Sequence, residues 1–231
     1  MLIHGFNKTT LLDYPGHLAS TIFLGGCNFR CPFCHNSTLV LAPTSQPIIP
    51  EEEIFSTLRK RTGIIEGVCI TGGEPTLYPG LVELIKKIKE LGFLVKLDTN
   101  GSNPKIIEYL IKEKLIDYIA MDIKNCKEKY PITSGLDSMD LNKLSDSISL
   151  ILNSKIDYEF RTTIVKNFHE TKDLIEIGKW IKGARVYFLQ SFRDSKDVID
   201  PGLLAYSLDE LNEFREVLRP YVKEVSLRGI E

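Results

Sequence analysis

The sequence predicts a single-domain α/β fold, a partial and open (β/α)6 barrel that resembles an incomplete TIM barrel. From residue 18 onward, six apolar strand-like segments alternate with six helical segments. The strand segments are apolar along their length instead of alternating, which is typical of a parallel sheet buried on both faces. Six units are fewer than the eight of a closed barrel. No repeat or linker divides residues 1–231, so we expect one domain.

The N-terminal third contains the first strand and the first helix. Residues 1–17 are expected to form an irregular lead-in that ends at the turn signal Pro15-Gly16. A strand is predicted over 18–25, followed by a loop over 27–36. Pro50 and the acidic residues Glu51–Glu53 indicate a helix that runs to about Arg61, because carboxylates favour the positive end of the helix dipole.

The rest of the chain continues the alternation. Apolar residues at helical spacing predict a helix over 80–91, and Pro104 suits the first turn of a helix over 104–114. Pro131 and Gly135 indicate a loop. Further strands are predicted over 64–71, 93–98, 117–122, 156–165 and 184–190, with one more over 222–227, and further helices over 139–153, 170–181 and 208–218.

Composition excludes some classes of function. Apolar residues make up 43% of the chain and charged residues 26%, an ordinary balance for a globular protein. With 31 acidic and 29 basic residues, we expect no general attraction to nucleic acid or to anionic membranes. No apolar stretch is long enough to span a bilayer, and the N-terminus lacks the pattern of a secretory signal. We therefore expect a cytoplasmic protein.

Three cysteines crowd the loop after the first strand. Cys27, Cys31 and Cys34 are spaced C-x3-C-x2-C, directly after two glycines. Three thiolates are one ligand short of a tetrahedral zinc site or of all four irons in a [4Fe–4S] cluster. Zinc with His35 as fourth ligand is the alternative, although adjacent Cys-His ligands are unusual in such sites. Cys69 and Cys126 are expected to be small buried residues.

Polar and glycine-rich segments follow the predicted strands. Ligand-binding residues gather at the carboxyl ends of parallel strands, so these segments should share one rim with the cysteine loop. Each segment alone could be a simple turn, but together they indicate a ligand site. They are Thr71-Gly72-Gly73-Glu74-Pro75, Asp98-Thr99-Asn100-Gly101 and Asp122-Ile123-Lys124, with Arg161 on the fifth strand and Gln190 at the end of the sixth.

These motifs resemble a known family. The three cysteines followed by Gly72-Gly73-Glu74 resemble the radical S-adenosylmethionine (radical SAM) superfamily. Asp13-Tyr14-Pro15-Gly16, His35-Asn36 after the cysteines and Leu97-Asp98-Thr99-Asn100-Gly101 resemble its glycyl-radical-enzyme activases, in particular the anaerobic ribonucleoside-triphosphate reductase activating proteins. Many activases have Asp-Gly-Pro-Gly where this chain has Asp13-Tyr14-Pro15-Gly16, a departure that leaves the subgroup open.

The resemblance implies a fold of the radical SAM type and a set of cofactor contacts. Cys27, Cys31 and Cys34 would each bind one iron of a [4Fe–4S] cluster, and S-adenosyl-L-methionine would chelate the fourth. The remaining implied contacts are Phe33, His35 and Asn36 with the nucleoside, Gly72, Gly73 and Glu74 with the methionyl amine, Asp98 and Asp122 with a monovalent cation, Lys124 with the methionyl carboxylate, and Arg161 and Gln190 with the ribose and adenine.

The resemblance also implies a reaction. Reductive cleavage of S-adenosylmethionine would give methionine and a 5′-deoxyadenosyl radical, which would remove a hydrogen from a glycine of a large glycyl radical enzyme. Anaerobic ribonucleoside-triphosphate reductase is the expected partner, with a flavodoxin or ferredoxin-type protein as electron donor. The alternatives are another glycyl radical enzyme or a small-molecule substrate. Gly72-Gly73-Glu74 argues against a non-catalytic metal-storage module.

Overall fold

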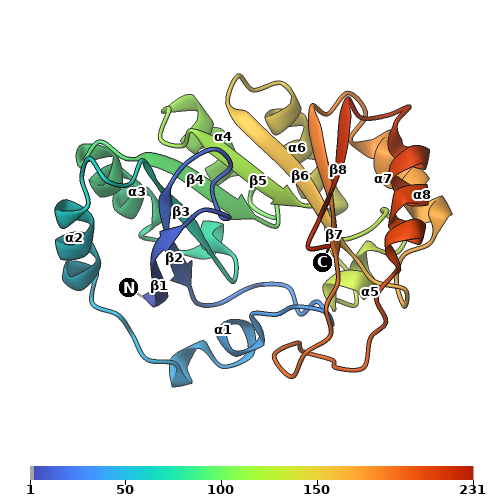
Figure 1. The fold of residues 1–231 in the computed structure, drawn as a ribbon, viewed down its shortest axis with the longest axis horizontal. Coiled ribbons are helices and arrows are strands. Elements are labelled where there is room, and N and C mark those ends of the chain that lie inside the picture. The colour runs from blue at the N-terminus through green and yellow to red at the C-terminus, as the bar shows by residue number, and fades with distance from the viewer. Residues whose placement is uncertain (1–2, 231) are drawn as a thin grey trace.

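One curved, mostly parallel sheet organises the protein (Figure 1). A computed structural model describes residues 3–230, and within this range eight strands lie in the order β1 to β8. β1 pairs antiparallel with β2, and every later pair is parallel. The strands are β1 Ile3–Thr10, β2 Ala19–Leu24, β3 Gly67–Gly72, β4 Leu94–Thr99, β5 Tyr118–Asp122, β6 Asp157–Ile164, β7 Val186–Ser191 and β8 Glu224–Arg228.

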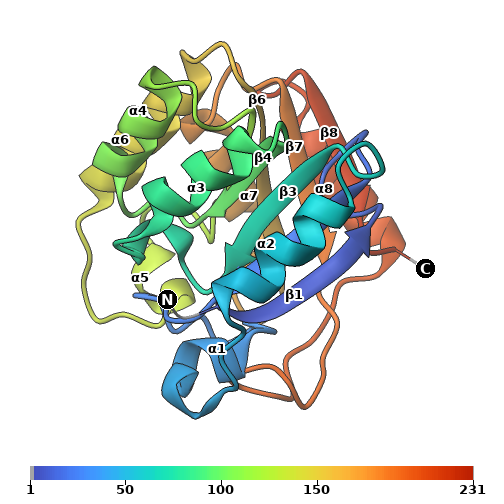
Figure 2. The same ribbon diagram turned by 90° about the vertical axis from the view of Figure 1, so that its left-hand side faces the viewer.

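Helices cover the outer face of the sheet (Figure 2). In α3, the apolar residues whose spacing predicts the helix are all buried, because this spacing places them on one side of the helix. They are Leu81, Leu84, Ile85 and Ile88. The helices are α1 Ser37–Leu41, α2 Glu51–Lys60, α3 Leu81–Glu90, α4 Pro104–Lys112, α5 Tyr130–Ser134, α6 Leu141–Leu152, α7 Thr171–Trp180 and α8 Leu208–Leu218, with short 3-10 helices at Pro43–Ser45 and Pro75–Leu77.

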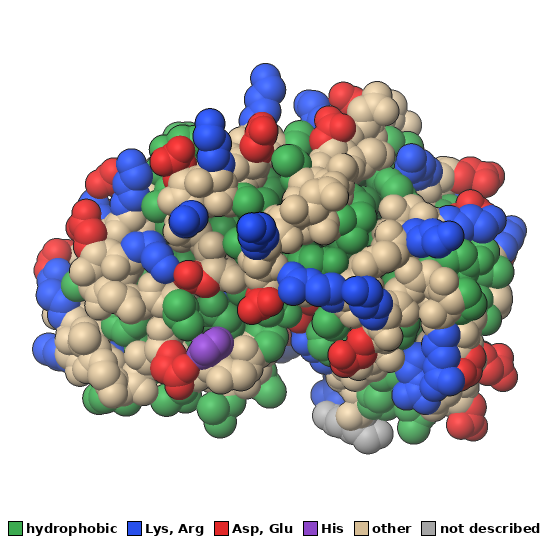
Figure 3. All heavy atoms as spheres, turned by 90° about the horizontal axis from the view of Figure 1, so that it is seen from above, with side chains coloured by type: hydrophobic (Ala, Val, Ile, Leu, Met, Phe, Trp, Pro, Cys, Tyr) green, Lys and Arg blue, Asp and Glu red, His purple; other side chains and the backbone are tan. Residues whose placement is uncertain are grey.

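The predicted open barrel is confirmed. Strands β2 to β7 are each followed by helical structure, which makes the six strand–helix units that the sequence predicts. Helix α8 spans the predicted residues, and the tail segment forms β8 beside β7. In the described residues β1 and β8 pair only with β2 and β7, so the barrel is not closed. Figure 3, which looks at the fold from above, shows a hollow at the edge of the molecule.

Two predictions about strands are wrong. Within the expected irregular lead-in over 1–17, residues Ile3–Thr10 form β1. Residues 11–17 are irregular turns and bends, as expected, and residues 1 and 2 lie outside the described residues. The polar sequence of β1 carries little strand signal, and pairing with the edge of β2, for example Phe6 with Ile22, supplies the hydrogen bonds. The strand predicted from residue 64 begins at Gly67, because Ile64 lies in an exposed turn.

The short helices α1 and α5 were not predicted. Helix α5 supports the cysteine loop. Pro131 and Gly135 indicated a loop here, but Pro131 lies in the first turn of α5, where a missing N–H is tolerated. Gly135 ends the helix with φ +67°. A Cβ at Gly135 would lie 2.1 Å from the carbonyl oxygen of Arg30, so glycine allows α5 to touch the loop.

The surface carries both charge signs. On the face seen in Figure 3, acidic and basic side chains are interspersed. Among the described residues, no helix combines the length and the apolar character needed to cross a bilayer.

The N-terminus of α8 offers a test of the local helix signal. Ser207 Oγ accepts a hydrogen bond from the Glu210 amide, and the Glu210 side chain accepts one from the Ser207 amide, which forms a capping box. Ser207→Ala should destabilise the protein by about 1 kcal/mol because an amide loses its partner. Thermal unfolding should show a midpoint about 2–4 °C lower.

The control for this change is Ser149→Ala, on an exposed position inside α6. Alanine is a good helix former, so this variant should unfold at or slightly above the wild-type temperature. Equal losses in the two variants would contradict the capping role of Ser207.

Candidate functional site

A cavity of about 300 Å³ lies at the carboxyl ends of the strands. This volume is at the lower end of the range for small-molecule sites. Every residue implied by the resemblance lines the cavity except Glu74. The predicted residues in the lining are Cys27, Cys31, Phe33, Cys34, His35, Asn36, Gly72, Gly73, Asp98, Asp122, Lys124, Arg161 and Gln190. The other lining residues are Phe29, Val40, Thr71, Thr99, Asn100 and Thr163.

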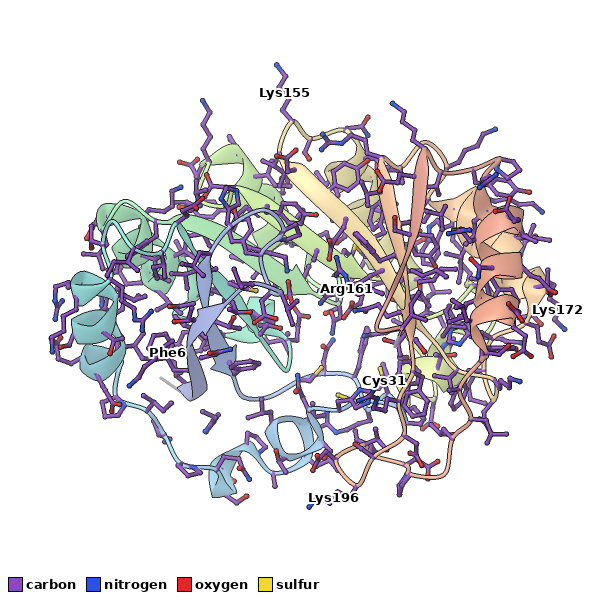
Figure 4. The ribbon with its side chains drawn as sticks, in the orientation of Figure 1. Phe6, Cys31, Lys155, Arg161, Lys172 and Lys196 are labelled. Atoms are coloured by element: carbon purple, nitrogen blue, oxygen red, sulfur yellow. The ribbon has the colours of Figure 1, made fainter. Side chains whose placement is uncertain are left out.

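The cysteine loop is fixed from two sides. Arg30 donates its backbone N–H to the Ser134 carbonyl at the end of α5, at 2.8 Å. On the other side, Asp200 donates its backbone N–H to the carbonyl of Pro32, also at 2.8 Å. Cys31 is buried, while Cys27 and Cys34 are half-buried. Figure 4 shows Cys31 in this loop, below the inner side of the sheet.

The three thiols suit an iron–sulfur cluster. All three line one cavity, and thiolates are the usual protein ligands of such clusters. Burial raises the pKa of Cys27 to about 11 and that of Cys31 to about 12, so without metal both thiols are protonated at neutral pH. Binding to metal deprotonates a coordinating thiol outright. The donor set therefore fits the cluster that the sequence predicts.

One ring nitrogen of His35 already has a partner. Its Nε2 donates to the carbonyl oxygen of Arg193 at 2.7 Å, and its ring contacts Phe192. These contacts occupy one ring nitrogen and fix the ring against the loop after β7. They give no support to the zinc alternative.

The Gly72-Gly73 pair packs against the chain that leads into the cysteine loop. The Gly73 amide donates to the Leu24 carbonyl and the Glu74 amide donates to the Gly26 carbonyl, both at 2.8 Å. A Cβ at Gly72 would lie 2.2 Å from the Leu24 oxygen, and one at Gly73 would lie 2.0 Å from the Gly26 oxygen. The absence of side chains therefore lets two loops approach closely, in addition to the access for a ligand that the sequence predicts.

Asn36 makes a further link between these two loops. Its Nδ2 donates to the carbonyl oxygen of Gly72 at 2.7 Å. The contact ties the end of the cysteine loop to the end of β3, while the side chain still lines the cavity.

Glu74 lies beside the cavity instead of in its lining. Its side chain is 2% exposed, and its carboxylate accepts hydrogen bonds from Thr76, from the Thr99 hydroxyl at 2.7 Å and from the Asn100 amide at 2.6 Å. Burial raises the pKa of Glu74, and the hydrogen bonds from Thr76, Asn100 and Thr99 oppose this shift. The carboxylate thus joins the ends of β3 and β4. Its implied contact with a methionyl ammonium stays a prediction.

Asn100 is a site residue that sequence reasoning missed. Its Nδ2 donates to Asn28 Oδ1 at 2.9 Å and lies 3.9 Å from Cys27 Sγ. The sequence did contain a signal for this residue, because Asn100 belongs to the same rim segment as Asp98. Its distance along the chain from the cysteines gave no information about its contact with their loop.

Phe33 and the charged residues form the walls of the cavity. The ring of Phe33 is buried against those of Phe168 and His169. On the inner side of the sheet, Arg161 bonds to Asp98 and Asp122, and Lys124 Nζ lies 3.0 Å from Asp122 Oδ2. The wall opposite the thiols is therefore charged and internally paired.

The two remaining cysteines are buried, as predicted, and neither lines the cavity. Cys69 lies inside the barrel, where its Sγ is 3.8 Å from a carboxylate oxygen of Asp98. Cys126 Sγ lies 3.6 Å from Asp173.

A family model decides the identity. The model described as Radical SAM superfamily matches residues 21–177, more than half of the chain, including all three thiols and the Gly72–Glu74 segment. The chain belongs to the radical SAM superfamily. It is therefore a radical SAM enzyme, and membership implies a [4Fe–4S] cluster and S-adenosylmethionine as its cofactors.

Two curated relatives align with most of this chain. A protein of Methanocaldococcus jannaschii is 35% identical to this chain, over 99% of this chain and 96% of its own length. It is named as a glycyl-radical enzyme activating enzyme, an assignment not itself established. The pyruvate formate-lyase-activating enzyme of Clostridium pasteurianum is 28% identical over 79% of this chain and 77% of its own length.

Solved structures share the fold. Streptococcus suis SuiB bound to S-adenosylmethionine matches with a TM-score of 0.69 at 18% identity, over 89% of this chain and 48% of SuiB. The protein anSMEcpe with bound AdoMet matches with a TM-score of 0.58 at 19% identity, over 85% of this chain and 57% of its own. This chain thus spans about half the length of these two proteins.

The close approach at Gly72 predicts a sharp effect of one added methyl group. Gly72 has φ +120°, and a Cβ there would overlap the Leu24 backbone. Gly72→Ala should disturb both loops and reduce the iron bound after anaerobic reconstitution. The matched control is Gly92→Ala, because Gly92 also has positive φ but has open space around its Cβ. Equal iron contents in the two variants would show that the approach of the loops does not matter.

The ligand assignment predicts the result of removing single thiols. Cys31→Ala should lose the cluster, or hold it unstably, because two thiolates from this loop are too few to anchor it. Cys126→Ala should retain it, since Cys126 is buried outside the cavity lining. Iron and sulfide analysis with visible absorption checks both. A Cys31→Ala protein with the normal iron content and normal release of 5′-deoxyadenosine would refute the assignment.

Proposed function

We propose that this chain is a glycyl-radical-enzyme activating enzyme. The observation that carries the proposal is its 35% identity, over nearly the full length of both chains, to a relative with that name. The alignment covers 96% of the relative, so nearly all of that protein has a counterpart in this chain. Cys27, Cys31 and Cys34 on one cavity supply the expected ligand set.

The residues that line the cavity have different proposed roles in binding the cofactors. When bound, the cluster and S-adenosylmethionine supply reductive cleavage to methionine and a 5′-deoxyadenosyl radical. Cys27, Cys31 and Cys34 would hold the cluster, with residues 27–36 of a domain spanning 1–231 as its binding loop. Phe33 would exclude water beside the nucleoside, and Lys124 would attract the methionyl carboxylate, since both side chains line the cavity.

The open side of the barrel suits a protein substrate. Within the described residues β1 and β8 remain unpaired with each other, so the inner side of the sheet is not sealed. We infer that a loop carrying the target glycine would approach the cavity from this side.

The finer assignments rest on the resemblance of the motifs and, for the location, on the composition of the sequence. We propose anaerobic ribonucleoside-triphosphate reductase as the partner, a flavodoxin or ferredoxin-type protein as the electron donor and the cytoplasm as the location. Similarity to a pyruvate formate-lyase-activating enzyme supports a different glycyl radical enzyme as the second candidate partner. The monovalent cation near Asp98 and Asp122 stays a prediction, and the contacts of both carboxylates with Arg161 favour its guanidinium in that position.

A direct test uses the reconstituted protein with candidate partners. Incubation with S-adenosylmethionine, a reductant and an anaerobic ribonucleoside-triphosphate reductase should produce a glycyl doublet in the electron paramagnetic resonance spectrum of the partner. A partner variant with alanine at the target glycine is the control and should give no doublet. The proposal fails if no candidate glycyl radical enzyme is activated while the protein consumes S-adenosylmethionine to modify a small molecule.

A further inference from the structure

The interior of this barrel carries charged side chains where such folds usually hold apolar ones. Barrel interiors are commonly filled by layers of branched apolar residues. Here Lys96 and Asp98 on β4, Asp122 on β5 and Arg161 on β6 form connected ion pairs. Figure 4 shows Arg161 on the inner side of the sheet, between the strands and the loop that carries Cys31.

Arg161 lies between two carboxylates. Its Nη2 donates to Asp98 Oδ2 at 3.0 Å, and its Nε donates to Asp122 Oδ1. The side chain is only 13% exposed, so these contacts are largely shielded from water. One planar guanidinium thus bridges the ends of β4 and β5, where the resemblance implies a monovalent cation.

The other two oxygens of these carboxylates also have cationic partners. Lys96 Nζ, 2% exposed, donates to Asp98 Oδ1, and Lys124 Nζ lies 3.0 Å from Asp122 Oδ2. Burial by itself would raise the pKa of both carboxyls. The charge of Arg161, followed by that of the neighbouring lysine, instead lowers the pKa of Asp98 and Asp122 below its ordinary value. Both groups therefore stay ionised and fully paired at neutral pH.

The balance of charge disfavours an additional cation. Lys96, Lys124 and Arg161 carry three positive charges against two on the aspartates, so this set of ion pairs has one net positive charge. The nearby Glu159 is not spare, because Arg228 holds its two oxygens at 2.9 and 3.1 Å. A net positive charge on the ion pairs beside the cavity attracts the carboxylate of an amino-acid ligand and repels a further cation.

We propose that the guanidinium of Arg161 takes the place of a free Na⁺ or K⁺ between Asp98 and Asp122, so that this enzyme binds S-adenosylmethionine without a monovalent cation. Arg161 acts here as a positioning residue that holds both carboxylates, and through Asp122 it orients Lys124 toward the cavity. The inference rests on superfamily membership and on these contacts. It does not depend on which protein is the partner.

The first test measures unfolding of the cluster-free protein in sodium, potassium and choline chloride at equal ionic strength. The wild type should unfold at the same temperature in all three salts, because its carboxylates already have a fixed cation. Arg161→Ala should unfold at a lower temperature in choline chloride and should recover part of the loss in sodium or potassium chloride, since the vacated position then accepts an ion.

The matched control is Arg219→Ala, which removes an exposed arginine paired with Glu216 at 2.9 Å. This variant should show neither the loss of stability nor the dependence on the cation. A purely structural role for Arg161 would lower the unfolding temperature equally in all three salts. That result, or a wild type that sodium or potassium stabilises relative to choline, would overturn the proposal.

The second test needs only the wild type and Arg161→Lys. Equilibrium binding of S-adenosylmethionine to the cluster-loaded wild type should be equal in sodium, potassium and choline chloride. Arg161→Lys retains a charge but lacks the planar fork that reaches both carboxylates, so its affinity should fall by about tenfold in choline chloride. Wild-type binding that requires sodium or potassium, or unchanged binding by Arg161→Lys, would contradict the inference even if activation of a partner succeeds.

Discussion

The site depends on the close approach between the chain after β2 and the chain after β3. Gly26 and Leu24 offer carbonyl oxygens to the amides of Glu74 and Gly73, and glycine at position 73 leaves the space for this contact. The approach holds the start of the cysteine loop against the end of β3. Because Cys27 follows Gly26 directly, the position of the first thiol is tied to the backbone of a neighbouring strand.

Glu74 extends this link to a third strand. Its buried carboxylate accepts hydrogen bonds from Thr99 and Asn100 at the end of β4, and Asn100 in turn reaches Asn28 in the cysteine loop. A buried carboxylate is costly unless its hydrogen bonds are satisfied, so these contacts act as a unit. The start of the cysteine loop, with Cys27, is thereby held by a closed set of interactions that runs from β2 to β4 and back.

The side of the cavity opposite the thiols is held together by ion pairs instead of backbone hydrogen bonds. Arg161 connects Asp98 on β4 with Asp122 on β5, and Lys124 completes the set at the cavity. Pairing keeps these groups ionised despite burial, and the buried Lys96 beside Asp98 gives the whole set one net positive charge. The cavity therefore has a soft metal-binding side and a side suited to an anionic group, as a cluster-bound amino-acid cofactor would require.

The sequence by itself determined the six strand–helix units, the thiol spacing and the rim segments, because these features depend on local periodicity and on residues adjacent in the chain. Only the tertiary structure decided that residues 3–10 form a strand, that Glu74 lies beside the cavity and that Arg161 bridges two aspartates. Such contacts depend on strand register and on side chains that meet across 25 or more residues of chain. Neither hydrophobic periodicity nor motif spacing carries that information.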